Sequence, residues 1–146
     1  MTSDLKLSQQ LCFSFYTINK LFHQLYKQVL MPYDLTYTQY LVLLVLWEKN
    51  DRQLHEVGEC LNLASNTLTP LLRRLEQKQL ITRVRLETDK RHLHIHLTSQ
   101  GLQLYQQLQP EITNFFAQLQ VLEDYQHDQL LQNNQKLIKL LENRLS

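Results

Sequence analysis

Cys12 carries the most reactive side chain near the start of this 146-residue sequence, which contains two cysteines. A cysteine thiolate attacks the oxygen of a peroxide, and the resulting sulfenic acid reacts further with a second thiol. No lysine, arginine or histidine lies within one helical turn of Cys12 in the sequence. A thiolate at this position would therefore depend on hydroxyl donors or on another chain. The alternative is a cysteine that packs as a small hydrophobic residue, which composition alone favours.

A basic segment between Arg73 and Arg91 is the second candidate for chemistry. It holds seven basic residues against three acidic ones, a local charge of +4, whereas the rest of the chain carries −3 and the whole chain +1. The near-neutral total therefore hides a polarised molecule, and a concentrated positive patch attracts the phosphates of nucleic acids. The alternative is a solvated basic hairpin on an ordinary helical protein.

The elements expected around this segment form a known motif. Leu54–Leu63 and Ser65–Gln79 have helical spacing, and Ile81–Leu97 alternates like a two-stranded ribbon with a polar tip at Glu87–Lys90. A short helix, a turn, a longer helix and a β-wing make a winged helix-turn-helix, which fits the major groove of DNA. We therefore predict a mainly α fold with a small β-wing.

Two groups of side chains are predicted to contact double-stranded DNA. The second helix of the motif is apolar on one side, and its other side carries short polar groups and arginines that suit phosphates and base edges. Its predicted contacts are Ser65, Asn66, Thr67, Thr69, Pro70, Arg73 and Arg74, with Arg73 or Arg74 on a guanine or on a phosphate. The cations of the wing would lie along the backbone or reach the minor groove. The predicted wing residues are Arg83, Arg85, Lys90, Arg91 and Asp89, which would orient Arg91.

Long helices are expected on both sides of this motif. Thr36 and Thr98 each precede a stretch with helical spacing and suit the N-cap position, and Asn50–Arg52 is a polar break. The expected helices are Ser8–Leu30, Tyr37–Glu48, Thr98 to about Gln120 with a break near Pro110, and roughly Glu123–Leu145.

The length and the apolar stripes predict one subunit of a dimer. Residues 1–146 fit a single subunit, with a DNA-binding lobe at about 36–98 and dimerisation helices at about 1–33 and 99–146. A compact monomer would struggle to cover the stripes of the terminal helices, whereas a two-fold dimer would cover them. A dimer would also hold two recognition helices at the spacing of a pseudo-palindromic site.

The composition excludes several classes of protein. No apolar run approaches the ~18 residues of a membrane span, and two cysteines without a signal peptide favour a soluble, cytoplasmic protein. No glycine-rich phosphate loop, nucleophile elbow or carboxylate pair is present, so neither an enzyme nor a cofactor is expected. His92, His94 and His96 alternate on one strand, but no second ligand cluster accompanies them, and no metal site is predicted.

The chain resembles the MarR family of winged-helix regulators over nearly its whole length, and most closely the branch that senses organic hydroperoxides (OhrR regulators). Four segments carry the resemblance: LCFSFY at Leu11–Tyr16, LTYTQYLVLLVLWE at Leu35–Glu48, NTLTPLLRRLEQKQLITR at Asn66–Arg83, and the D-x-R of Asp89–Arg91. The last two point only to the broad family, whereas Cys12 in its LCF context and LTYTQY point to the peroxide sensors.

The resemblance implies a homodimeric repressor that releases its operator when Cys12 is oxidised. It assigns Tyr26 and Tyr37 as hydroxyl partners of the Cys12 sulfur, and Tyr16, one turn after Cys12, is an additional local contact. Cys12 and Tyr26 are 14 positions apart on the expected helix, roughly 21 Å along its axis, so a partner subunit must bring them together.

No cysteine follows Cys60, so the resemblance is to the one-cysteine type, in which a small cellular thiol or further oxidation completes the switch. The apolar neighbours Leu11, Phe13 and Phe15 suit bulky organic hydroperoxides better than hydrogen peroxide. Cys60 itself has no counterpart in the family's sensing pattern and is expected to be a core cysteine.

Three other functions compete with this hypothesis. A MarR-type repressor released by a small phenolic or drug-like ligand would leave Cys12 inert, so its substitution by serine would preserve induction. A thiol peroxidase without DNA binding would turn over excess hydroperoxide. A helical protein-interaction module would leave the clustering of basic residues unexplained.

Overall fold

The computed structural model describes residues 5–120 and 126–146, and these residues are mainly helical. The chain divides into two compact units, Met1–Leu108 and Gln109–Ser146, which are described separately. The elements in chain order are a 3-10 turn (Leu7–Gln9), α1 (Leu11–Leu30), a 3-10 turn (Met31–Tyr33), α2 (Tyr37–Glu48), β1 (Arg52–Gln53), α3 (Leu54–Leu61), α4 (Ser65–Gln77), β2 (Ile81–Leu86), β3 (Asp89–Leu97), α5 (Ser99–Leu119) and α6 (His127–Leu145).

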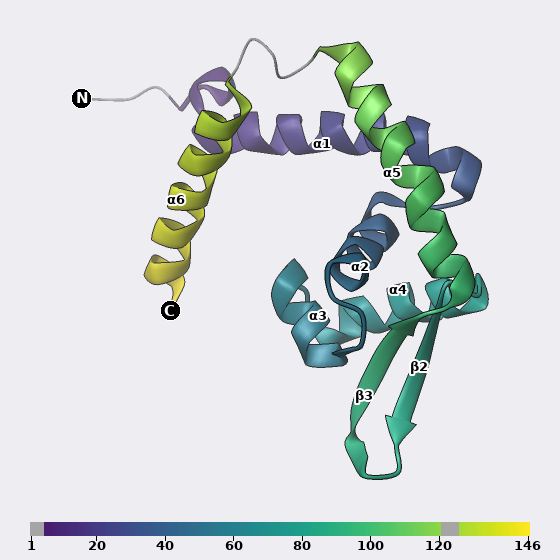
Figure 1. Cartoon of the computed structure of the whole chain (residues 1–146). Coiled ribbons are helices and arrows are strands. Elements are labelled where there is room, and N and C mark those ends of the chain that lie inside the picture. Colours follow the sequence, from purple (N-terminus) through teal and green to yellow (C-terminus); the bar gives the residue numbers. More distant parts are fainter. Residues whose placement is uncertain (1–4, 121–125) are drawn as a thin grey trace. The chain divides into compact units, whose positions relative to one another are not determined.

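The first unit contains the predicted winged helix-turn-helix. Helix α3, a turn and helix α4 precede the hairpin of β2 and β3, which projects beyond them (Figure 1). The hairpin is antiparallel, with Ile81 opposite Leu97 and a register shift between Val84 and Leu86. These observations confirm the predicted fold class.

A third strand was not predicted. The polar stretch expected as a break overlaps β1 at Arg52, and Arg52 pairs with Ile95 of β3, so the sheet order is β1-β3-β2. Two residues give too short a run for alternation to be visible, which explains why this strand escaped sequence analysis.

Helix α2 begins where its capping residue predicts. The Thr36 hydroxyl accepts from the Gln39 backbone N–H (3.3 Å), and the Gln39 side-chain oxygen accepts from the Thr36 N–H (3.2 Å). This reciprocal capping box satisfies two backbone donors at the helix start. Val42, Leu43 and Leu46 of α2 are fully buried, so α2 forms the centre of the core. The fully buried leucines of α4 are Leu68, Leu72 and Leu75.

Helix α5 contradicts the expected break near Pro110. Ser99–Leu119 is continuous, with Pro110 inside it. Proline removes one intrahelical N–H, but Gln106 and Pro110 are both exposed, so water can reach the freed carbonyl. The expected cap is present, because Thr98 Oγ1 accepts from the Gly101 N–H at 3.1 Å.

The helix α6 begins at His127, whereas the sequence predicted a start near Glu123, which lies outside the described residues. Most of its apolar side chains are exposed, including Leu131, Ile138 and Leu141, whereas Leu137 is half-buried. In the first unit, Leu11, Ile18 and Leu21 of α1 are likewise exposed. Both helices thus keep exposed apolar side chains within a single chain, and the dimer stays a prediction.

Among the described residues, no single helix is long and apolar enough to cross a membrane, although the bent pair Leu11–Tyr33 and Tyr37–Glu48 passes the length and composition test together. Helix α2 of this pair is mostly buried in the core of the first unit.

Candidate functional site

Helix α4 presents the predicted polar face to solvent. Leu68, Leu72 and Leu75 hold its other face in the core. Ser65, Asn66, Thr67, Pro70, Arg73 and Arg74 are exposed, and Thr69 is half-buried, with its hydroxyl donating to the Ser65 carbonyl at 2.8 Å. Ala64 occupies the N-cap and supplies no side-chain acceptor, although the Thr67 and Leu68 N–H groups both donate to its carbonyl at 3.0 Å.

Arg73 and Arg74 are the two cations that α4 offers from its exposed surface. Neither forms an ion pair or hydrogen bond through its side chain within the part of the chain that the structure describes. Their guanidinium groups therefore need no rearrangement to bind an external acceptor.

Arg83, in contrast, is already engaged. Its Nη2 donates to Glu76 Oε1 at 3.0 Å and its Nε to Glu76 Oε2 at 3.2 Å, and its backbone N–H also donates to Oε2 at 3.2 Å. These hydrogen bonds lower the pKa of Glu76 below its ordinary value, with the Arg83 side chain as the largest cause. Arg83 therefore connects β2 to α4, and a DNA contact by it would be indirect.

Among the described residues, Lys90 and Arg91 of the wing form no hydrogen bond or ion pair through their side chains, whereas Arg85 does. Lys90 and Arg91 are exposed, and Arg85 Nη1 donates across the hairpin to the Lys90 carbonyl at 3.2 Å. The expected pair of Asp89 with Arg91 is not among the ion pairs of the described residues, because Asp89 Oδ2 instead lies 3.5 Å from His94 Nε2.

Three tyrosines form a cluster between α1 and α2. The ring centroid of Tyr26 lies 4.6 Å from that of Tyr37 and 5.6 Å from that of Tyr40. Burial, followed by the neighbouring Tyr40 and Tyr37, raises the pKa of Tyr26 to about 12, and burial also raises the pKa of Tyr37 and of Tyr40. All three phenols are therefore neutral hydrogen-bond donors near pH 7. Sequence analysis missed Tyr40, although its spacing of three from Tyr37 places both on one helix face.

Cys12 is exposed on α1 and lies far from these tyrosines in its own chain. Helix α1 is unbroken from Leu11 to Leu30, so the 14-residue separation from Tyr26 corresponds to roughly 21 Å. Tyr16, one turn away, has its ring stacked on Phe13 with centroids 6.0 Å apart. A single chain therefore holds the predicted redox residues in two separate places.

Cys60 is exposed, which contradicts the expected core position. Leu54, Val57, Gly58 and Leu61 define the inner face of α3, and position 60 falls outside that spacing, a signal that was available in the sequence. Arg52 Nη1 lies 3.4 Å from the Cys60 sulfur and donates to it.

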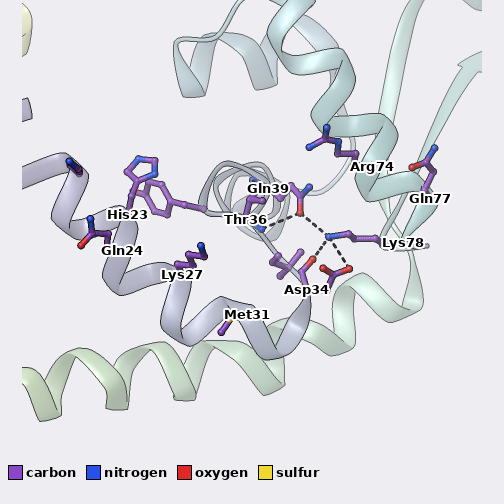
Figure 2. A pocket seen from close by; sticks show the side chains of 13 residues that line it. His23, Gln24, Lys27, Met31, Asp34, Thr36, Gln39, Arg74, Gln77 and Lys78 are labelled. Atoms are coloured by element: carbon purple, nitrogen blue, oxygen red, sulfur yellow. Dashed lines mark hydrogen bonds and ion pairs between the residues drawn. The ribbon is translucent and has the colours of Figure 1, made fainter.

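A pocket of about 780 Å³ lies between α1, α2 and the end of α4, and Figure 2 shows its side chains. Lys20, Lys27, Arg74 and Lys78 contribute positive charge, and Tyr37 joins it to the tyrosine cluster. Lys78 Nζ donates to Gln39 Oε1 at 3.0 Å and to the Asp34 carbonyl, and lies 3.5 Å from Asp34 Oδ2. Sequence analysis did not predict this pocket, because Asp34 and Lys78 are 44 positions apart.

Two of the three wing histidines, His94 and His96, lie beside aspartates, whereas His92 contacts the ring of His55. His94 Nδ1 lies 3.3 Å and His96 Nε2 3.5 Å from Asp51 Oδ1. No group of three metal-ligating side chains occurs in residues 5–120 and 126–146.

A family model described as transcriptional regulator SarA/Rot matches residues 24–108, more than half of the chain. The chain belongs to the SarA/Rot family of transcriptional regulators. The resemblance to MarR-type winged-helix regulators is thereby confirmed.

Three relatives of this SarA/Rot-family chain are informative. It is 46% identical over 97 residues to the organic hydroperoxide resistance transcriptional regulator of Bacillus subtilis strain 168, covering 66% of both chains. It is 46% identical over 95 residues to the HTH-type transcriptional regulator SarZ of Staphylococcus aureus strain USA300, covering 65% of this chain and 64% of SarZ. The matched stretch thus spans just under two thirds of these curated relatives.

The third relative is the regulator AbfR, whose structures cover the chain more fully. Reduced AbfR bound to DNA superposes with a TM-score of 0.78 at 41% identity, covering 92% of this chain and 95% of AbfR. Overoxidised AbfR bound to DNA gives a TM-score of 0.73 at 43% identity, with coverage of 90% and 94%.

Proposed function

We propose that this SarA/Rot-family regulator is a homodimeric DNA-binding repressor that senses organic hydroperoxides through Cys12 and then releases a pseudo-palindromic operator. The observation that carries the proposal is the exposed polar face of α4, where Arg73 and Arg74 have no side-chain partner among the described residues, on the same unit as a cluster of neutral tyrosines. The first feature suits operator DNA, and the second suits a cysteine thiolate.

DNA binding follows from the geometry of the motif. Short polar side chains at the start of α4 can approach base edges, while Arg73 reaches a base or a phosphate. Lys90 and Arg91 at the tip of the exposed wing supply phosphate contacts beside the groove. The complex of reduced AbfR with DNA, from a relative of 41% identity, supports this mode of binding.

Redox sensing requires a second copy of the chain. The separation of roughly 21 Å along α1 prevents Cys12 from reaching Tyr26 within one subunit. A two-fold dimer that covers the exposed apolar stripes of α1 and α6 would place Cys12 against the tyrosine cluster of its partner. Neutral phenol groups there would donate to the sulfur and favour its thiolate form.

The proposed chemistry uses a hydroperoxide and a small cellular thiol. The Cys12 thiolate attacks the terminal peroxide oxygen, the O–O bond breaks, and the departing alkoxide takes a proton to become an alcohol. The small thiol then attacks the Cys12 sulfenic acid, forming a mixed disulfide and releasing water. Because overoxidised AbfR forms a DNA complex, we expect the mixed disulfide, rather than further oxidation, to release the operator.

The surroundings of Cys12 support the proposed oxidant class. Leu11 and Phe13 beside it are exposed, so the approach to the sulfur is apolar and suits a bulky organic hydroperoxide better than hydrogen peroxide. The chain is proposed to consume one hydroperoxide per subunit and not to be an enzyme. Sustained turnover of hydroperoxide with excess thiol would instead indicate a peroxidase.

Fluorescence anisotropy on the upstream DNA of the chain's own gene tests the proposal. Reduced native protein should bind, and treatment with an organic hydroperoxide and thiol should release it. The Cys12→Ser variant should stay bound, whereas Cys60→Ser, the matched control, should be released like the native protein. If the affinity for the operator is unchanged by the oxidant in the native protein and in both variants, the proposed redox sensing is wrong.

The pocket between α1, α2 and α4 favours a second candidate function. Lys20 and Arg74 line a cavity large enough for a small ligand, and a phenolic carboxylate bound there would touch the end of the recognition helix. Release of the operator by such a compound, with Cys12→Ser responding equally, would favour a ligand-gated repressor.

A further inference from the structure

Lys78 joins the recognition helix to the corner between α1 and α2. It is the C-cap residue of α4, and its ammonium group donates to Gln39 Oε1 at 3.0 Å and to the Asp34 carbonyl. Figure 2 shows these contacts converging on the Lys78 nitrogen from the start of α2. Only 26% of the Lys78 side chain is exposed, so the contact is partly shielded from water.

The burial of Gln39 makes its hydrogen bond to Lys78 energetically important. Within the part of the chain that the structure describes, Gln39 is the only buried polar side chain, with 2% exposure. Its Oε1 accepts from both the Thr36 N–H and Lys78 Nζ. A buried acceptor that loses its donor is costly, so the positions of these groups are strongly linked. The ion pair with Asp34 matters less, because the Asp34 side chain is 95% exposed.

The same capping box holds Tyr37, which lies between Thr36 and Gln39. The Tyr37 ring packs on Tyr26 with centroids 4.6 Å apart and lines the pocket that Lys78 also lines. A shift of Tyr37 therefore displaces the first turn of α2, where both hydrogen bonds of Gln39 Oε1 are formed.

We propose that Lys78 is the positioning residue that transmits oxidation at the Cys12–tyrosine site to the recognition helix, through the Thr36–Gln39 capping box. This inference rests on the proposed function. Oxidation of Cys12 removes the thiolate that the tyrosines face, and Tyr37 then shifts together with the first turn of α2. Because Gln39 in that turn is hydrogen-bonded to Lys78, Lys78 and the end of α4 shift as well. The apolar core between α2 and α4 supports the helix in both states, and Lys78 adds the state-dependent contact.

The test compares operator affinity before and after oxidation in four proteins: native, Lys78→Met, Lys78→Arg and Lys27→Met. Lys78→Met keeps the length of the side chain but removes the donor. Lys78→Arg retains N–H donors within reach of Gln39. Lys27 lines the same pocket and forms no ion pair or hydrogen bond through its side chain with the described residues, so Lys27→Met is the matched control.

We expect the ratio of oxidised to reduced Kd to fall by about tenfold in Lys78→Met and to remain native in Lys78→Arg and Lys27→Met. The rate of Cys12 oxidation, followed by mass spectrometry, should be native in all four proteins, because Lys78 acts after the chemistry. A role confined to helix stability would change both affinities by one factor and leave the ratio unchanged.

An unchanged ratio in Lys78→Met, with native protein still released by oxidant, overturns this inference alone. If native protein binds the operator and oxidation does not release it, the proposed function fails, and the coupling role fails with it. If Lys78→Met does not fold, a Lys78→Ala variant with native circular dichroism, which also lacks a side-chain donor, replaces it with the same expected loss.

Discussion

Glu76 of α4 holds Arg83 of β2 with both carboxylate oxygens, at 3.0 Å from Oε1 to Nη2 and 3.2 Å from Oε2 to Nε. The Nη2–Oε1 contact is an ion pair, and the Arg83 side chain is only 20% exposed. The recognition helix and the first strand of the wing are therefore fixed to one another at this point. The wing therefore takes its direction from α4.

Replacement of Glu76 by Gln should destabilise the fold mainly above pH 4. The folded pKa of Glu76 lies below its unfolded value of about 4.5, so its contribution is present above that value and is lost as the pH falls through the folded pKa. Because Glu76 is 40% exposed, the expected loss is about 0.5–1 kcal/mol at pH 7. Urea denaturation at pH 7 and at pH 3 should show a larger difference from native protein at pH 7 than at pH 3. The control is Glu59→Gln, on exposed α3 surface; an equal loss in that variant would contradict the assignment.

Gly101 should not tolerate alanine. A Cβ there would lie 2.2 Å from the Leu80 carbonyl oxygen, a backbone atom that cannot move aside cheaply. We expect Gly101→Ala to destabilise the fold by about 2–4 kcal/mol. Thermal unfolding followed by circular dichroism measures this loss, and Gln103→Ala, at an exposed position of the same helix, should be near neutral. A native melting temperature for Gly101→Ala would show that α5 does not approach Leu80 this closely.

Trp47 depends on the same glycine through a hydrogen bond. Its Nε1 donates to the Gly101 carbonyl at 2.9 Å, and its ring lies 5.3 Å from that of Tyr105. Trp47→Phe keeps an aromatic ring but removes the donor, so a loss of about 1 kcal/mol is expected in urea denaturation. A variant as stable as native protein would mean that water replaces the bond.

Arg73 should contribute more to operator binding than Arg74. Both are exposed, but Arg74 lines the pocket beside Lys78, whereas Arg73 is not part of that lining. Arg73→Ala should weaken binding by about tenfold and reduce the slope of log K against log salt by about 1, with a smaller effect for Arg74→Ala. Lys136→Ala in α6 is the control. The reverse order of the two arginines would place the pocket side of α4 against the DNA.

Much of the fold was predictable because its elements are long or strongly patterned. Thr36 and Gln39 have the spacing of a capping box and so predict the start of α2, and alternation between Ile81 and Leu97 predicts the wing. Pro110 misled the prediction because its interference with a helix is weak where the freed carbonyl meets water. Strand β1 was missed because two residues show no period.

The candidate site was predictable only where a local pattern carries it. The exposed face of α4 follows from the spacing of its leucines. The exposure of Cys60 could likewise have been predicted from the spacing of the apolar residues of α3. In contrast, the link of Lys78 to Asp34 and Gln39 depends on the packing of α4 against the α1–α2 corner. The ion pair between Arg83 and Glu76 could not be predicted from the sequence either, since a basic residue in a wing has the same sequence pattern whether it is paired or free.

Tyr26 should accelerate the oxidation of Cys12 as a neutral donor, over a wide pH range. Burial raises its pKa to about 12, so its phenol stays protonated up to well above the ordinary tyrosine value of 10.0. Tyr26→Phe removes the hydroxyl but keeps the ring against Tyr37, so we expect about tenfold slower formation of the Cys12 sulfenic acid. Stopped-flow measurement of that rate in native protein should show no fall between pH 9 and 11, and absorbance titration should assign no ionisation to Tyr26 in that range. Tyr105→Phe, a change outside the Tyr26–Tyr37–Tyr40 cluster, is the control. A rate that falls near pH 10 in native protein but not in Tyr26→Phe would show that the phenol ionises there, and that its environment in the assembled regulator is more open to water than in the single chain.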